Sequence, residues 1–326
     1  MNSDDLPLSR LGLDRDTARR TEPGLLQELA ADPATRVLSV RGGRVLADFS
    51  EGHPALVTTA AAEAEAAAAA GTASGAPIWA YLGTADGQPY LAVLQPEVGA
   101  GEDSGQRWPA GDGPADLSTD GLRAVNLRDI GALLGEVDAG LATGALALAN
   151  WHHGHTHCPR CGAITEVEAA GWVRRCPVDR SQHFPRTDPA VIMAITDPQD
   201  RLLIARSARW PSNQYSVPAG FVEPGESLEA AVRREVLEET RVRVGEVRYG
   251  ASQPWPFPAS LMCAFTGRTA DRHPVPDGDE VVDARFVDRE QIAAAWADGS
   301  IRPPRPTSVA RALIEDWFAR PLPLPR

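Results

Sequence analysis

The sequence predicts an α+β protein built from three successive parts. The first part has short apolar runs separated by turn residues, the middle is rich in cysteine and histidine, and the last part alternates strands with helices. The predicted boundaries are 1–150, 151–186 and 187–326. We therefore expect an N-terminal α/β domain, a small metal-binding segment and a C-terminal α/β domain, because a chain of 326 residues exceeds roughly 150 residues per domain.

Four patterns organise the N-terminal part. The apolar runs 36–40 and 90–94 predict strands, and the alanine-rich segment 60–70 predicts a helix. Residues 99–114 are rich in Gly, Asp and Pro and predict a loop. Apolar residues recur at helical spacing over 127–151 and predict one long helix. The first hundred residues contain no motif that carries chemistry, so we expect a structural or dimerising domain.

Composition narrows the function. The net charge of −12 argues against a large nucleic-acid footprint, since duplex binding depends on basic side chains that neutralise phosphates. All 32 basic residues are arginine, so a phosphate must be held by arginine, a backbone amide or a metal ion. The acidic N-terminus has no apolar signal segment, and the four cysteines are too few for a disulfide scaffold. These features predict a cytoplasmic protein.

The C-terminal part begins with two predicted strands, 191–195 and 202–205, which are joined by a turn. A helix is predicted over 227–240, with Ser227 as its N-cap, and the last helix over 308–318.

The helix at 227–240 has an unusual buried face. Leu228, Val232, Glu235 and Glu239 lie on one stripe at about 100° per residue, and Glu238 flanks it. Two carboxylates therefore interrupt the face that should meet the core, and burying unpaired charge is costly. Oxygen ligands at this density suit Mg²⁺ or Mn²⁺.

A solvated acidic helix paired with Arg233 and Arg234 is the alternative interpretation. The wider pattern favours the metal site, because residues 220–242 resemble the Nudix box, G-x5-E-x7-R-E-U-x-E-E-x-G-U, in which U is a bulky aliphatic residue. The exception is Arg241, which stands where the family has glycine. A non-glycine residue with positive φ at this helix end is expected to cost about 1 kcal/mol.

The resemblance to Nudix hydrolases implies an α/β/α sandwich with a mixed sheet and metal-dependent hydrolysis of a diphosphate linkage. It implies that Glu238 is a further ligand or activates water, and that Glu226 supports the box. The implied catalytic residues are Glu226, Glu235, Glu238 and Glu239. The implied Mg²⁺ or Mn²⁺ ligands are Glu235, Glu239, Glu280 and the Ala219 carbonyl.

A second signal is the segment Ser-Gln-Pro-Trp-Pro-Phe-Pro-Ala-Ser at 252–260. Three prolines restrict its backbone, so a rigid surface loop is one interpretation. The segment is also similar to the signature of the NADH pyrophosphatase branch of the Nudix family. That resemblance implies a substrate-binding role for Gln253, Pro254, Trp255, Pro256, Phe257, Pro258, Ala259 and Ser260.

The same resemblance implies a reaction and further contacts. NADH or NAD⁺ would be cleaved to (reduced) nicotinamide mononucleotide and AMP, and an NAD cap would be removed from an RNA 5′ end. Phe184 and Phe221 would stack on a base, with core packing as the alternative, and Arg128 and Ala310 would contact substrate. Family members are typically homodimers. Alternative functions are hydrolysis of ADP-ribose or another dinucleotide, and a zinc-ribbon binding protein with an inactive Nudix scaffold.

The cysteine pattern predicts a structural zinc site. Cys158 and Cys161 form one C-x2-C knuckle, and Cys176 begins a second in which Asp179 replaces the fourth cysteine. His183 and His157 are rival donors. We expect Zn²⁺ on the three cysteines with Asp179 or His183 as the fourth ligand. The alternative is a ribbon without metal, held by packing.

Overall fold

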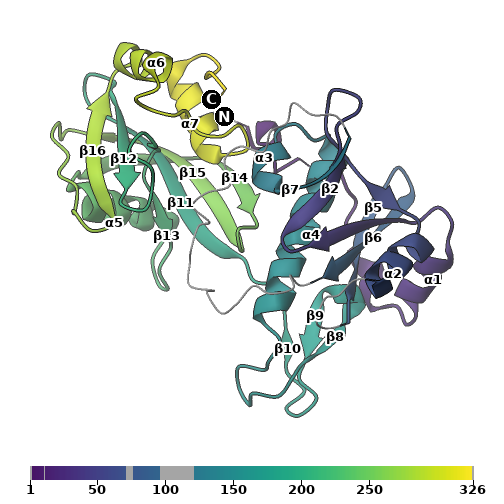
Figure 1. Cartoon of the computed structure of the whole chain (residues 1–326). Coiled ribbons are helices and arrows are strands. Elements are labelled where there is room, and N and C mark those ends of the chain that lie inside the picture. The colour runs from purple at the N-terminus through teal and green to yellow at the C-terminus, as the bar shows by residue number, and fades with distance from the viewer. Residues whose placement is uncertain (1, 11, 71–75, 96–120, 325–326) are drawn as a thin grey trace.

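The computed structural model describes residues 2–10, 12–70, 76–95 and 121–324. Three sheets follow one another along the chain (Figure 1). The loop predicted at 99–114 lies outside the described residues. Within the described ranges, no helix is long and apolar enough to cross a membrane.

The N-terminal domain is a seven-stranded sheet with helices on both faces. The first strand is parallel to the sixth, and these are the two strands that the sequence predicted. The sheet order is β3-β2-β1-β6-β5, with β4 beside β1 and β7 beside β2. The strands are β1 (Arg36–Arg41), β2 (Arg44–Asp48), β3 (Ala55–Leu56), β4 (Thr58–Thr59), β5 (Ile78–Ala85), β6 (Gln88–Gln95) and β7 (Leu122–Val125).

Two helices, α1 (Leu25–Ala31) and α2 (Ala61–Ala70), pack on one face of this sheet, and α2 confirms the helix predicted from the alanine-rich segment. The other face is covered by α3 (Leu127–Ile130) and α4 (Glu136–Gly154). Short 3-10 helices lie at Ser3–Asp5, Thr17–Thr21 and Ala169–Gly171.

The single helix predicted over 127–151 was wrong, because the chain breaks it between α3 and α4. The break has a tertiary cause. The N–H of Ala132 donates to Thr307 Oγ1 at 3.2 Å, and a Cβ on Gly131 would lie 2.8 Å from the Thr307 methyl group. The segment that contains Thr307 therefore contacts the chain just after α3 ends.

A small three-stranded antiparallel sheet links the two larger domains (Figure 1). Its order is β10-β9-β8 along the sheet, so each strand pairs with its neighbour in sequence. The strands are β8 (Glu166–Glu168), β9 (Val173–Arg175) and β10 (Gln182–His183).

The C-terminal domain is a mixed six-stranded sheet. Its strands are β11 (Asp188–Thr196), β12 (Leu202–Ser207), β13 (Ala219–Phe221), β14 (Val244–Trp255), β15 (Ser260–Thr269) and β16 (Val281–Val287). The order is β14-β15-β11-β12-β16, and β13 pairs with the first half of β11. β11 and β15 are parallel, and the other pairs are antiparallel.

Helices cover both faces of this sheet. α5 (Leu228–Thr240) packs on one face around Val232, Val236 and Phe265. α6 (Arg289–Asp298) and α7 (Val309–Phe318) pack on the other. This arrangement confirms the predicted α/β/α sandwich with a mixed sheet. Helix α6 was not predicted from the sequence, although Asp288 and Gln291 form a capping box that marks its start.

The carboxylate helix α5 begins and ends as predicted. Ser227 Oγ accepts the N–H of Ala230 at 3.2 Å, and Arg241 adopts the left-handed conformation with φ 58°. The N–H of Arg241 donates to the Leu237 carbonyl at 3.0 Å, so the helix closes without the glycine of the family pattern.

Candidate active site

One arginine organises the carboxylates of the box. Arg234 Nη1 donates to Glu235 Oε1 at 2.9 Å and to Glu238 Oε2 at 3.1 Å. Its Nη2 donates to Glu226 Oε1 at 2.5 Å and to the Phe221 carbonyl at 2.9 Å. The Arg234 hydrogen bond holds the pKa of Glu226 below its usual value. Arg234 therefore ties the loop before α5 to the carboxylate face of the helix.

Glu239 has the environment expected of a cation ligand. It is buried, and its Oε2 has no hydrogen-bond partner in the structure. Burial, followed by the charges of Glu235 and Glu280, raises the pKa of Glu239 to about 8. A buried carboxylate among other carboxylates needs a compensating charge, so these residues fit a divalent cation.

Glu235 lies against the backbone of β13. A Cβ built on Gly220 would lie 2.0 Å from the Glu235 carboxyl carbon, so only glycine leaves room for this carboxylate. Burial raises the pKa of Glu235. The carboxylate thus lies against Gly220, the residue after Ala219, whose carbonyl is proposed to share the metal.

The loop that carries Glu280 is held by Asp277, a residue that was not predicted from the sequence. Asp277 Oδ1 accepts the N–H groups of Asp279, Glu280 and Val281 at 2.8–3.0 Å. The N–H of Asp277 donates to the Glu239 carbonyl at 3.2 Å. Asp277 therefore fixes the loop of Glu280 to the end of α5. The turn signal Asp277-Gly278 was the available hint.

The carboxylates of the box lie near one another, but their oxygens are not all within ligand distance of one common point. Across the described part of the chain, only the cysteine cluster below has three or more candidate ligand atoms that all lie within 4.8 Å of one another. Glu235, Glu239 and Glu280 remain within electrostatic reach of one another. The structure places them on α5 and at the start of β16, and their metal roles stay predictions.

The proline-aromatic loop packs against the N-terminal domain. Trp255 and Phe257 are half-buried against its core, with their rings edge to face at 4.9 Å. Arg128 lies over the Phe257 ring, 4.3 Å from its centroid. Gln253 is fully buried, where its amide accepts the Leu8 N–H at 3.2 Å and donates to the Thr307 carbonyl at 3.0 Å. The loop is therefore a domain junction as well as a candidate binding element.

The start of β11 joins this loop to the box. The N–H of Asp188 donates to the Ala259 carbonyl at 2.8 Å, and the Pro189 carbonyl accepts the Val222 N–H at 3.0 Å. Two consecutive residues thus contact the two motifs, on opposite edges of one strand. Where they pair with β11, β13 of the box and β15 of the loop are two strand spacings apart, which is about 10 Å. The tertiary structure brings both sequence signals to one end of the sheet.

The remaining predicted contacts lie in three different settings. Phe221 is 46% exposed on β13 beside Ala190. Phe184 is 62% exposed and lines a cavity of about 590 Å³ with Trp151 and Arg186. Ala310 is buried in the core of the C-terminal domain. Their substrate roles stay predictions.

The predicted zinc residues come together. The candidate ligand atoms of Cys158, Cys161, Cys176 and Asp179 all lie within 4.8 Å of one another. The Sγ atoms of Cys161 and Cys176 are 3.4 Å apart, and Cys158 Sγ lies 3.6 Å from Asp179 Oδ2. Tetrahedral ligands at about 2.3 Å from zinc are separated by about 3.8 Å. The cluster therefore fits one zinc ion.

Asp179 is the better placed of the two rival fourth ligands. The Ser181 hydroxyl and N–H donate to its Oδ1 at 2.5 and 2.9 Å, which lowers the pKa of Asp179 and leaves Oδ2 facing the cysteines. His183 Nε2 lies 3.1 Å from the Ser181 hydroxyl, and the ring also hydrogen-bonds Cys158, but His183 is not among the four residues whose ligand atoms all lie within 4.8 Å of one another.

Replacing Cys176 by serine is expected to remove about one zinc per chain and to lower stability by at least about 2 kcal/mol, because structural zinc binding is part of the folding free energy. Metal analysis and thermal unfolding measure both effects. Cys263→Ser is the control for zinc content, since Cys263 lies in the core of the C-terminal domain and outside the cluster. A parent protein purified without zinc, with Cys176→Ser equally stable, would show that the ribbon is metal-free.

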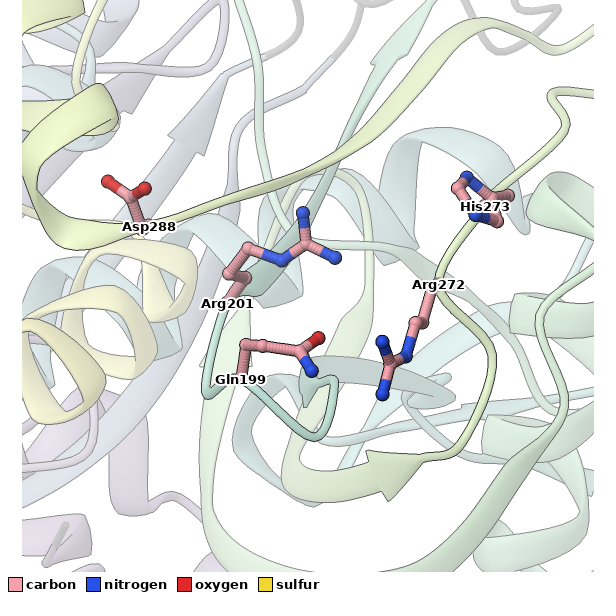
Figure 2. Close-up of a pocket in the computed structure, with 5 residues that line it drawn as sticks. All are labelled: Gln199, Arg201, Arg272, His273 and Asp288. Carbon is pink, nitrogen blue, oxygen red and sulfur yellow. The ribbon is translucent and has the colours of Figure 1, made fainter.

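A second hollow, of about 630 Å³, lies at the other end of the C-terminal sheet, and Figure 2 shows the residues that line it. Its charges are largely balanced. Arg201 donates to the buried Asp197 at 2.6 Å, and Gln199 bridges Asp197 to Arg272 once its amide is oriented to satisfy both. No residue predicted from sequence lines it. The lining residues are Gln199, Arg201, Arg272, His273 and Asp288.

Comparison with known proteins agrees with this geometry. The NUDIX domain family matches residues 186–306, and the NADH pyrophosphatase zinc ribbon domain family matches residues 153–184. Residues 186–306 therefore form a Nudix domain, as predicted. The ribbon is of the type found in NADH pyrophosphatases.

Two named relatives are similar to part of this chain. NAD-capped RNA hydrolase NudC from Mycobacterium bovis is 41% identical over 206 residues, which are 60% of this chain and 66% of that protein. NAD-capped RNA hydrolase NUDT12 from Homo sapiens is 38% identical over 197 residues, 57% of this chain and 43% of that protein. A solved NUDIX hydrolase from Nitrosomonas europaea is 24% identical over 51% of this chain and 94% of its own, with a TM-score of 0.41.

Proposed function

We propose that this protein hydrolyses the pyrophosphate bond of NADH and NAD⁺, giving reduced or oxidised nicotinamide mononucleotide and AMP. The observation that carries the proposal is the start of β11, where Asp188 and Pro189 contact the proline-aromatic loop and the box. A dinucleotide has a diphosphate between two aromatic bases. A carboxylate metal site beside a fixed aromatic pair matches that chemistry. The names of the two relatives agree with it.

Glu235, Glu239, Glu280 and the Ala219 carbonyl would hold Mg²⁺ or Mn²⁺. Such an ion supplies charge neutralisation on the diphosphate oxygens. The chain itself supplies a base: Glu238 is exposed and is oriented by Arg234 at 3.1 Å, so its free oxygen can take a proton from the attacking water. Glu226 keeps Arg234 in place through two hydrogen bonds.

Product analysis tests the proposal. Purified protein with Mg²⁺ or Mn²⁺ is supplied with NADH, NAD⁺, ADP-ribose, diadenosine polyphosphates and NAD-capped RNA. We expect AMP and reduced nicotinamide mononucleotide from NADH. Inert NADH beside rapid ADP-ribose hydrolysis would overturn the assignment and favour the alternative dinucleotide hydrolase. Inertness towards all five substrates would favour the inactive scaffold.

The relatives' names favour capped RNA as a second substrate. Removal of an NAD cap breaks the same pyrophosphate bond, so one site serves both reactions. We further propose that Asp179 is the fourth zinc ligand, that the protein is a homodimer and that it acts in the cytoplasm.

Trp255→Ala and Phe257→Ala are each expected to raise the KM for NADH about tenfold or more, since stacking on a base contributes about 1–3 kcal/mol. Binding of Mn²⁺ should change little, because neither ring belongs to the proposed metal site. Steady-state kinetics and Mn²⁺ titration measure the two effects. Tyr249→Ala is the control, as Tyr249 is an exposed aromatic residue earlier on β14. Unchanged NADH kinetics in both loop variants would show that the loop is structural.

A further inference from the structure

The turn between β14 and β15, which forms the tip of the proline-aromatic loop, has few backbone donors of its own. Pro254, Pro256 and Pro258 have no N–H group. Between them, the N–H of Phe257 bonds within the loop, to the Trp255 carbonyl at 2.7 Å. The carbonyls of Pro256 and Pro258 find their donors outside the loop.

One side chain of the N-terminal domain supplies these donors. Asn150, near the end of α4, donates through Nδ2 to the Pro256 carbonyl at 2.8 Å and to the Pro258 carbonyl at 3.1 Å. These two carbonyls stand on either side of Phe257. Asparagine is suited to this contact, because one amide nitrogen carries two N–H groups.

Buried neighbours of Asn150 prevent α4 from rotating about its axis. The next residue, Trp151, is buried in the core of the N-terminal domain. His152 is also buried, and its Nε2 lies 2.9 Å from the Gly171 carbonyl. Neighbouring side chains thus fix α4, so Asn150 presents its amide to the loop from a rigid support.

The ring of Phe257 is held by a second residue of the same domain. Arg128, on α3, lies over its face at 4.3 Å, and Trp255 meets it edge to face at 4.9 Å. The N-terminal domain therefore contacts the loop on its backbone through Asn150 and on its aromatic face through Arg128.

We infer that Asn150 is a positioning residue for dinucleotide binding, whose amide fixes the backbone on both sides of Phe257 and so sets the Trp255–Phe257 pair for the substrate. The inference rests on the proposed function. It gives the N-terminal domain a part in substrate binding.

Asn150→Asp tests the inference, because it keeps the side-chain volume, removes both donors and sets a carboxylate against two carbonyls. We expect the KM for NADH to rise about tenfold with kcat changed less than about twofold, as loss of two hydrogen bonds that order a binding loop implies. In the full-length protein, hydrogen exchange over 253–260 should become faster while the rest of α4 keeps its protection. Asn213→Asp is the matched control, since Asn213 donates to the Gly299 carbonyl far from the loop.

The two readouts separate this inference from the proposed function. If the parent protein leaves NADH intact, the proposed function fails, and hydrogen exchange still decides whether Asn150 orders the loop. Unchanged exchange over 253–260 in Asn150→Asp would overturn the inference. Faster exchange with an unchanged KM would also overturn it, because the ordered loop would then not serve binding. A rise in KM equal to that produced by Asn213→Asp would also overturn it, because it would indicate a general structural effect.

Discussion

Glu239→Gln is expected to lower NADH turnover by at least about two orders of magnitude, because it removes a charged ligand from a site whose chemistry is charge stabilisation. The structure makes Glu239 the most sensitive of the box carboxylates. It is buried, and its Oε2 has no protein partner. Steady-state kinetics with NADH and Mn²⁺ titration measure the effect. Full activity in a well-folded variant would remove Glu239 from the proposed site.

The same variant is expected to fold at least as well as the parent without metal. The pKa of Glu239 is raised to about 8 from an ordinary value of 4.5. Its stabilising contribution is therefore complete below pH 4.5 and is lost as the pH rises through 8. Glutamine does not ionise, so it avoids this pH-dependent loss of stability. Without metal, the unfolding temperature of the variant should therefore rise relative to that of the parent as the pH increases from 4.5 to 8. Thermal unfolding with chelator at several pH values checks the sign.

Gly220→Ala is expected to lower turnover by at least about tenfold with little loss of fold. The added Cβ would meet the Glu235 carboxyl carbon at 2.0 Å, and the movable partner is the end of a flexible side chain. Glu235 must therefore move away from Gly220, and a displacement of about 1 Å at a catalytic group can cost about 100-fold. Turnover and Mn²⁺ affinity should fall together.

Gly245→Ala is the matched control, because a Cβ there meets only the Arg268 carbonyl at an ordinary 3.5 Å. Its kinetics should match the parent. Equal activity in Gly220→Ala and Gly245→Ala would mean that Glu235 does not need its observed position. A second variant, Gly220→Ala with Glu235→Gln, should be no worse than Glu235→Gln alone, since both changes act on one carboxylate.

Much of the C-terminal domain could be predicted because its signals are local. Helix α5 follows from its apolar spacing and its N-cap, and both are read within about four turns of one helix. The cysteine cluster follows from the spacing of Cys158, Cys161 and Cys176, since a metal site of this kind is assembled from two short turns. The left-handed conformation at Arg241 was predictable for the same reason.

Two of the errors arose where distant segments meet. The break between α3 and α4 depends on Thr307, which lies 175 residues after Ala132. Asp277 could not be recognised as the support of Glu280 until the loop was seen to fold back on Glu239. Neither contact leaves a periodic trace in the sequence.

The sequence by itself determined the Nudix domain, the carboxylate helix and the cysteine cluster, because short-range spacing dictates which side chains share a helix face or a turn. Only the tertiary structure decided which of these side chains are buried and which charges act on them. Burial is a property of the packed chain, and it turns Glu239 into a carboxylate that needs a cation. Packing also joined α4 to the proline loop through Asn150, over 106 residues of sequence.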